Sequence, residues 1–406
     1  MKKSMPILLA LAICLSACAP TESQPAGETP ATAETSPAQA TAESALSAVG
    51  NLTMYGGSRS GEGCYYYDGV WDDPASGEAK WALFRLDYAT GQRQLLQTFG
   101  RYDGGMSPSD PFVSGGRVYC TAGREIYCLS PDGSEKQVVS AQETLNWMCS
   151  DENACYLVES NVFNNTPRPQ VKRIDLQTGA VTGWELPAMN LLSVHDSRGS
   201  RVLVSRCITD QPLPSMEDME LFNAVLQNAT MEYGWMDLAT GDWQGILSFP
   251  YDSHRGDAAG HTEQWSYEGM RGEDLYFRRM VIDEAGNTLS TTLEHCALDG
   301  SGMTELAKLQ SDRSIYPVCR GTDLVWLMDY AYTGTATIYD VENGKTYENI
   351  PVQPTDSGWP LALTEDGRVL VNDHYNQWGE STYAILDADD YLGGSRDWTV
   401  FTDGEN

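Results

Sequence analysis

The chain is short of positive charge, of long apolar runs and of known catalytic motifs. Of its 406 residues 26 are Lys or Arg and 57 are Asp or Glu, which gives a formal charge of −31. This excess repels phosphate backbones and anionic lipid headgroups, so it excludes nucleic-acid binding and a polybasic membrane-surface role. After the first twenty residues no apolar stretch is long enough to span a bilayer as a helix.

Catalytic and metal signatures are also missing from the sequence. It has no Gly-x-Ser-x-Gly elbow, His-Glu-x-x-His pair or phosphate loop. His254 and His261, with Asp257 between them, are candidate metal ligands, but their spacing matches no tight motif. We therefore predict a binding protein with no catalytic residues, metal or cofactor. An enzyme that uses paired acids stays an alternative, because any two of 57 carboxylates can face each other.

What the chain has in quantity is aromatic and turn-forming residues. Hydrophobic residues make up 41% of it, with 11 Trp and 21 Tyr, which excludes a disordered chain. The 38 Gly and 19 Pro indicate many turns rather than long helices.

The first residues have the pattern of an export signal. Met1-Lys2-Lys3 is cationic, Pro6 to Ser16 is apolar, and Leu15-Ser16-Ala17-Cys18 follows. This resembles the lipobox of bacterial lipoproteins, which implies a signal peptide over 1–17 and a lipid on Cys18. An ordinary secretory signal with a chance Cys is the alternative. The lipid would anchor the chain to a membrane in the extracytoplasmic cell envelope.

Residues 18–49 contain Ala, Pro, Thr, Ser and Glu but no basic or aromatic residue. Such a composition cannot bury a core, so we predict a solvated tether before a domain at 50–403.

The rest of the chain repeats a short apolar run that ends in an Asp-containing turn closed by Gly. The copies are LFRLDYATG (83–91), IYCLSPDG (126–133), VKRIDLQTG (171–179), YGWMDLATG (233–241), LEHCALDG (293–300), TIYDVENG (337–344) and TYAILDADD (382–390). The period is near 45 residues, with insertions in the fourth and fifth repeats. A period of ~40–50 residues with several short strands each is typical of a β-propeller.

We predict an all-β, seven-bladed propeller of four-stranded antiparallel blades. The expected blades are 51–100, 101–141, 142–188, 189–250, 251–310, 311–352 and 353–403. A miscounted first or last copy would make six or eight. The turns resemble those of TolB-like and PQQ-like bacterial propellers, a likeness that speaks to fold and not to function.

The repeat turns have a structural explanation. Glycines at their ends supply positive φ, at Gly91, Gly133, Gly179, Gly241, Gly300 and Gly344. Asp87, Asp175, Asp237 and Asp340 can each accept backbone N–H groups two or three residues on. A Ca²⁺ site stays an alternative only at Asp387-Ala388-Asp389-Asp390, which has three carboxylates.

Loop lengths favour one face of the disc. The first and third connections of each blade are tight, whereas the second connections and the links between blades are long. The longest, Ile208 to Met231, is predicted to hold a short helix with Ser215 as its N-cap and an apolar side packed on the disc. Long loops on a rigid scaffold commonly carry binding residues, so we predict that this face binds.

Aromatic residues are frequent at the same ends of the strands. The predicted ligand-binding residues are Trp147, Trp265, Tyr316, Trp359, Tyr330, Tyr332, His374, Tyr375 and Trp378. Such rings stack on sugars or on peptide aromatics, although they also fill gaps between blades.

Eight cysteines remain after Cys14 and Cys18. Cys149 with Cys155, and Cys120 with Cys128, flank tight turns and are candidate disulfides. Eight buried free thiols are the alternative.

The predicted function is a lipid-anchored propeller that binds a carbohydrate, a peptide or a partner protein through its long-loop face, without chemistry of its own. A glycoside hydrolase or lyase, and a scaffold in an envelope complex, are the alternatives.

Overall fold

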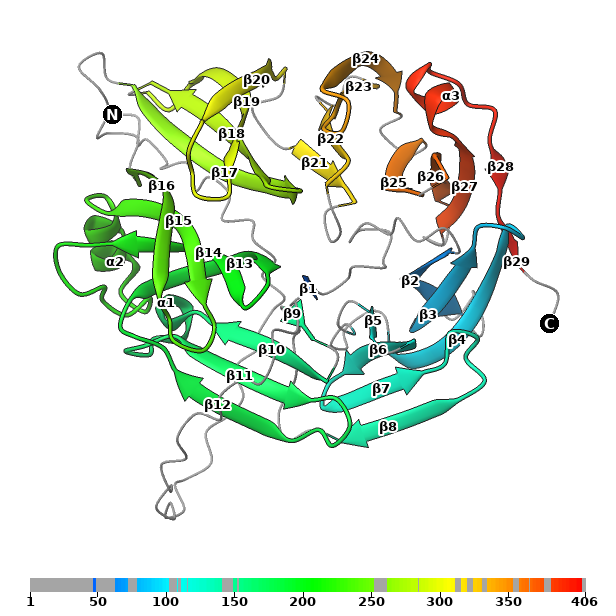
Figure 1. Ribbon diagram of the computed structural model, residues 1–406, viewed down its shortest axis with the longest axis horizontal. Helices are drawn as coiled ribbons and strands as arrows, with labels where there is room; N and C mark the ends of the chain where they lie inside the picture. The colour runs from blue at the N-terminus through cyan, green and yellow to red at the C-terminus, as the bar shows by residue number, and fades with distance from the viewer. Residues whose placement is uncertain are drawn as a thin grey trace, which may run out of the picture.

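A computed structural model describes residues 47–48, 63–71, 79–101, 108, 111–114, 116–140, 149–151, 153–251, 261–283, 285–310, 315–319, 324–330, 334–352, 358–364, 366–375 and 381–403. The strands in these ranges form seven sheets arranged in a ring, as Figure 1 shows. The chain is a seven-bladed β-propeller, which confirms the prediction from the repeats.

Five blades consist of four strands in chain order, innermost first. Blade 2 contains β5 (Phe112–Ser114), β6 (Arg117–Ala122), β7 (Glu125–Leu129) and β8 (Lys136–Ser140). Blade 4 contains β13 (Asn190–Arg198), β14 (Arg201–Ile208), β15 (Thr230–Asp237) and β16 (Trp243–Pro250). Blade 5 contains β17 (Thr262–Arg271), β18 (Asp274–Ile282), β19 (Thr288–Ala297) and β20 (Thr304–Lys308).

The last two blades follow the same order. Blade 6 contains β21 (Ile315–Val318), β22 (Trp326–Tyr330), β23 (Thr335–Asp340) and β24 (Lys345–Pro351). Blade 7 contains β25 (Trp359–Leu363), β26 (Arg368–Tyr375), β27 (Ser381–Asp387) and β28 (Thr399–Val400). Neighbouring strands in these five blades are antiparallel.

Two blades receive a strand from an end of the chain. Blade 3, with β9 (Cys149–Ser150), β10 (Ala154–Glu159), β11 (Gln170–Asp175) and β12 (Val181–Glu185), gains β1 (Ser47–Ala48) at its inner edge. Blade 1, with β2 (Gly63–Trp71), β3 (Ala79–Asp87) and β4 (Gln92–Arg101), gains β29 (Thr402–Asp403) at its outer edge. This last strand departs from the antiparallel pairing of the blades, because β29 runs parallel to β4.

In the ranges given above, three short helices lie outside the sheets. They are α1 (Asn161–Asn164), α2 (Met219–Leu226) and α3 (Ala388–Leu392). Among the described residues no helix combines the length and the apolar character that crossing a membrane requires.

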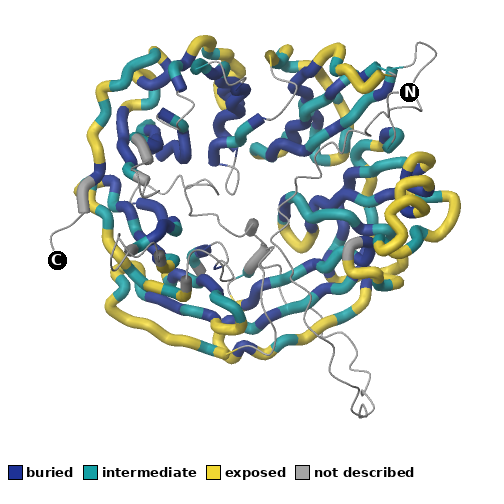
Figure 2. The backbone as a smooth tube through the Cα atoms, turned by 180° about the vertical axis from the view of Figure 1, so that it is seen from behind, coloured by how far each residue is buried: buried dark blue, intermediate teal, exposed yellow. Residues whose placement is uncertain are grey.

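The hydrophobic core lies between the blades, not at one centre. Separate clusters fill the gaps, such as Leu203, Trp235 and Phe277 between blades 4 and 5. Figure 2 shows buried residues concentrated on the inner strands, while the outer strands are largely exposed. Because both sides of the inner strands are covered, their sequences do not alternate cleanly between apolar and polar residues.

The repeat turns have the predicted geometry. In the first, Asp87 Oδ1 accepts the N–H of Ala89 at 3.1 Å and of Thr90 at 2.9 Å, and Thr90 Oγ1 donates to it at 2.9 Å. Asp175, Asp237 and Asp340 accept equivalent bonds. The predicted turn glycines, including Gly91 at φ 65°, all have positive φ.

Antiparallel pairing places the connections on two faces of the disc. One, the short-loop face, carries the connections between first and second strands and the repeat turns, for example 199–200 and 238–242 in blade 4. The other, the long-loop face, carries the second connections and the links between blades, for example 209–229. The segment 388–398, which includes α3, is a long connection outside this pattern.

Candidate functional site

Three of the predicted ligand-binding aromatics meet at the long-loop ends of blades 6 and 7. Tyr316 is the second residue of β21, Tyr330 is the last residue of β22, and Trp359 is the first residue of β25. The ring of Trp359 lies edge to face with Tyr316 at 4.6 Å and with Tyr330 at 5.4 Å between centroids. Tyr330 is buried, whereas Tyr316 and Trp359 are half-buried. Part of this cluster is therefore open to a ligand.

A buried amide lies beside this cluster. Asn372 is the cross-strand partner of Trp359, and Tyr383 is its partner on the other side. The side chain is only 3% exposed, yet its Oδ1 has no hydrogen-bond partner among the described residues. A buried carbonyl oxygen without a donor costs roughly 1–3 kcal/mol, so such a group calls for an explanation. Sequence reasoning missed Asn372, because an Asn in an apolar strand gives no signal of its own.

The strand that carries Asn372 is distorted at the next residue. The register of β26 shifts between Asn372 and His374, which leaves Asp373 as a bulge. Asp373 is held there by Trp398 Nε1, which donates to Oδ1 at 2.8 Å, and by Thr382 Oγ1, which donates to Oδ2 at 3.1 Å. Bulges often occur next to binding sites, where they redirect a side chain.

Of the other predicted binding residues, one lies in the core between two blades, and the rest have side chains outside the described part of the chain. Trp265, in β17, is 9% exposed and packs with Phe277 in the core between blades 4 and 5, away from the Trp359 cluster. His374 and Tyr375 end β26, but their side chains lie outside the described part. Trp147, Tyr332, Trp378 and Cys18 lie outside the described residues.

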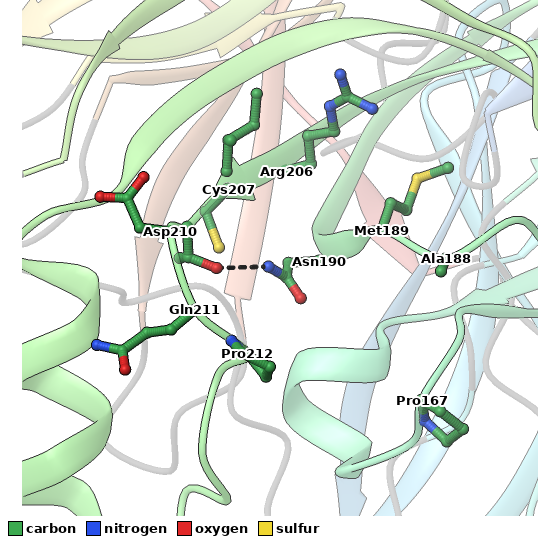
Figure 3. A pocket seen from close by; sticks show the side chains of 11 residues that line it. Pro167, Ala188, Met189, Asn190, Arg206, Cys207, Asp210, Gln211 and Pro212 are labelled. Atoms are coloured by element: carbon green, nitrogen blue, oxygen red, sulfur yellow. Dashed lines mark hydrogen bonds between the residues drawn. The ribbon is translucent and has the colours of Figure 1, made fainter.

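The long-loop face also has a groove between blades 3 and 4. Its volume is about 450 Å³, and Figure 3 shows its walls, which are formed by the loop before β11, the link into β13 and the segment after β14. The lining residues are Pro167, Ala188, Met189, Asn190, Arg206, Cys207, Ile208, Thr209, Asp210, Gln211 and Pro212. Asn190 Nδ2 donates to Thr209 Oγ1 at 3.2 Å, which joins two of the walls.

The cationic side chain of the groove is already paired, and its thiol is unreactive. Arg206 donates through Nε and Nη2 to Glu232 Oε2 at 2.9 and 2.8 Å and lies 3.9 Å from the ring centroid of Trp243. Burial raises the pKa of the Cys207 thiol to about 11, so it is a poor nucleophile at neutral pH. The groove thus offers amides, one hydroxyl and the carboxylate of Asp210, but no free cation among its described lining residues.

The predicted helix of the long insertion forms, but its start was wrong. Asp218 is the N-cap and accepts the N–H of Leu221, while Ser215 accepts the N–H of Glu217 in a turn before the helix. Phe222 and Leu226 pack on the disc as expected. Leu221, however, is 51% exposed, so the apolar side is only partly covered.

A buried polar group lies between blades 4 and 5. His195 Nε2 is 2.9 Å from Ser205 Oγ, and Tyr267 donates to Asp196 Oδ2 at 2.7 Å. Ser205 and Asp196 are 4% and 8% exposed. The bond between Tyr267 and Asp196 joins blade 5 to blade 4, whereas the contact between His195 and Ser205 lies within blade 4. We assign both a structural role.

The predicted disulfide between Cys120 and Cys128 is absent, because both thiols are free and buried. Cys155 is buried, but the side chain of Cys149 lies outside the described part of the chain, so this pair stays a prediction. The register is one residue away from the predicted one: Cys155 faces Ser150, and Cys149 faces Tyr156. Likewise Cys120 faces Tyr127, so that Cys120 and Cys128 point to opposite sides of the sheet.

The Asp387 turn, where Ca²⁺ was the alternative, is a helix start. Asp387 caps α3 by accepting the N–H of Asp389 at 2.9 Å and of Asp390 at 3.4 Å. Carboxylates in the first turn of a helix also interact well with its dipole. In the described part of the chain no three or more His, Cys, Asp and Glu residues gather as metal ligands.

The fold and these sites define a β-propeller with a loop-rich face. No protein-family model matches the chain, and no curated protein matches it. Among solved structures, an oligogalacturonate lyase in complex with manganese is 11% identical, with 83% of this chain and 100% of that chain covered and a TM-score of 0.46. The β-propeller domain of the Trilobed protease from Pyrococcus furiosus is 12% identical, with 85% and 95% covered and a TM-score of 0.49.

The prediction that the chain lacks chemistry of its own is corrected by these comparisons. The similar propellers include enzymes, among them that lyase and an acylaminoacyl peptidase (9% identity, 84% of this chain and 51% of that chain, TM-score 0.46). The missing sequence motifs are no evidence against activity, because catalysis by paired acids leaves no motif in a sequence. Similarity at this level assigns no activity either.

Proposed function

We propose that the long-loop face binds a carbohydrate at the cluster formed by Tyr316, Tyr330, Trp359 and Asn372. The single observation that carries the proposal is the pairing of half-buried aromatic rings with the buried Asn372 Oδ1, which lacks a donor. A sugar suits both groups, because its C–H face stacks on an indole while its hydroxyls donate hydrogen bonds.

A neutral ligand fits better than an acidic one. The group next to Asn372 is the carboxylate of Asp373, and the chain has a formal charge of −31. Both disfavour an anion. Asn372 Oδ1 can only accept, so the ligand must offer a hydroxyl or an N–H.

The test is binding of the full chain to an array of neutral oligosaccharides, uronate oligosaccharides and peptides, followed by calorimetry on the hits. We expect neutral oligosaccharides to bind, and Trp359→Phe and Asn372→Leu each to weaken binding at least tenfold. Leu221→Ser, on exposed α2, is the matched control and should bind as wild type. Binding only to peptides, or binding that both site variants retain, would reject the carbohydrate site.

We also propose that the chain is held at a membrane by a lipid on Cys18. The segment Leu15-Ser16-Ala17-Cys18 resembles a lipobox, which supports this proposal. So does the segment that follows, whose only charged residues are acidic. Mass spectrometry of the mature N-terminus and detergent phase partition test it. Wild type should enter the detergent phase and Cys18→Ser should not; equal partition would reject the anchor.

A further inference from the structure

We infer that the N-terminal segment enters the ring from the short-loop face, so that the long-loop face points away from the anchoring membrane and meets partners from that side. The orientation relative to the membrane rests on the proposed anchor at Cys18, whereas the point of entry does not.

The inference begins with the position of β1. This strand lies at the centre of the ring in Figure 1, where it adds to the inner edge of β9 and also contacts β13. The N-terminal segment therefore joins the disc at its central channel, between blades 3 and 4, and not at its rim.

The direction of β1 follows from the pairing. β9 is the first original strand of blade 3, so it runs from the long-loop face toward the tight turn at 151–153. β1 is antiparallel to it, with Ser47 opposite Ser150 and Ala48 opposite Cys149. Ser47 is therefore at the short-loop end, and the polypeptide before it joins from that side.

The length of the tether bears on which face of the disc points toward the membrane. Twenty-eight residues lie between Cys18 and Ser47, and a random coil of that many residues has a root-mean-square span on the order of 30 Å. A tether that short, attached at the centre of one face, turns that face toward the lipid. The Trp359 cluster and the groove at Asn190 both lie on the opposite face.

The short-loop face is also unsuited to a close contact with anionic lipids. It carries the repeat turns, and hydrogen bonds from Ser130 and Ser134 lower the pKa of Asp132 to about 2. The pKa values of Asp175 and Asp237 are lowered too: burial opposes the shift, but bonds from the turn residues outweigh it. These carboxylates stay charged at neutral pH and hold the face off an anionic surface.

A single substitution tests the entry. Ala48→Cys places a thiol opposite the native Cys149, and cross-strand neighbours are close enough for a disulfide. Under mild oxidation of the full chain, mass spectrometry should find Cys149 linked to position 48. Ser47→Cys faces Ser150 and is the control that should not link to Cys149. No link in Ala48→Cys, or a link from Ser47→Cys, would overturn the entry.

Energy transfer on vesicles tests the orientation. Gln177, on a short-loop turn of blade 3, and Gln211, in the long loop of blade 4, are both exposed. A donor dye on Gln177→Cys should transfer to acceptor-labelled headgroups more efficiently than one on Gln211→Cys, in lipidated protein bound to vesicles. Equal or reversed efficiencies would overturn the orientation. If both signals match a Cys18→Ser background, the anchor and the membrane orientation are rejected together, while the cross-link still decides the entry.

Discussion

The repeat turns of the short-loop face and the Trp359 cluster of the long-loop face differ in how their polar groups are paired. On the short-loop face, Asp87 Oδ1 alone accepts three hydrogen bonds from its own turn. On the long-loop face, the buried Asn372 Oδ1 has no donor among the described residues, and a groove of about 450 Å³ is open. A polar group whose hydrogen bonds are complete stabilises the fold. A buried group that lacks a partner calls for an explanation, and for Asn372 we propose a ligand.

The largest expected effect comes from the packed turns of the short-loop face. A Cβ on Gly300 would lie 2.5 Å from the carbonyl oxygen of Ile246, at a φ of 82°. Gly300→Ala should therefore lower the free energy of unfolding by about 2–5 kcal/mol.

Gly91 provides the control, because its φ of 65° is similar but nothing lies within 4 Å of its Cβ position. Gly91→Ala should cost only about 1 kcal/mol, the backbone part alone. Both values come from denaturant unfolding. Equal losses would show that close packing of the turns contributes nothing.

Acid should weaken the short-loop face next. The pKa values of Asp87, Asp132, Asp175 and Asp237 are lowered in the folded state. Their stabilisation is thus present above the unfolded pKa of about 4 and is lost as pH falls through the lower folded values. The free energy of unfolding should decline between about pH 5 and pH 2.

Asp132→Asn should make that decline shallower, because one of the lowered pKa values is then removed. Thermal unfolding across the pH series measures both slopes. An identical slope in the variant would mean that the charge of Asp132 contributes nothing to the acid sensitivity.

On the long-loop face, removal of a polar group should raise the free energy of unfolding instead of lowering it. Asn372→Leu replaces an unpaired buried amide with a side chain of similar size, so it should raise the free energy of unfolding by about 1 kcal/mol while binding is lost. Asn343, on the short-loop face, donates to Asp340 Oδ2 at 2.8 Å, and Asn343→Leu should lower stability by about 1 kcal/mol. Destabilisation by Asn372→Leu would place Asn372 among the structural groups.

The smallest effect is expected in the groove. Gln211 is exposed and lies in the long insertion, so Gln211→Ala should change the free energy of unfolding by less than about 0.5 kcal/mol. A larger loss in chemical denaturation would show that the groove wall supports the blade.

Much of the fold was predictable because its signals are local. A turn that needs positive φ selects Gly, and the predicted second blade, 101–141, contains all four strands from β5 to β8. The meeting of Tyr316, Tyr330 and Trp359 followed from their shared place at strand ends. Trp265 has the same signal but lies in a core, because the sequence does not say which side of a blade a side chain faces.

What the sequence could not predict depends on register and on very short strands. Cys155 pairs with Ser150, one residue away from Cys149, and the geometry of the tight turn sets this register. β1 and β29 have two residues each, too few for any periodic pattern. The unpaired state of Asn372 depends on neighbours from three strands.

The final strands have a consequence for synthesis. β28 completes blade 7, Phe401 is buried and donates its N–H to Tyr383 O at 2.8 Å, and β29 then pairs with blade 1. The last five residues of the described chain, 399–403, thus add a strand both to blade 7 and to blade 1. Until those residues leave the ribosome, β27 and β4 each keep a bare outer edge.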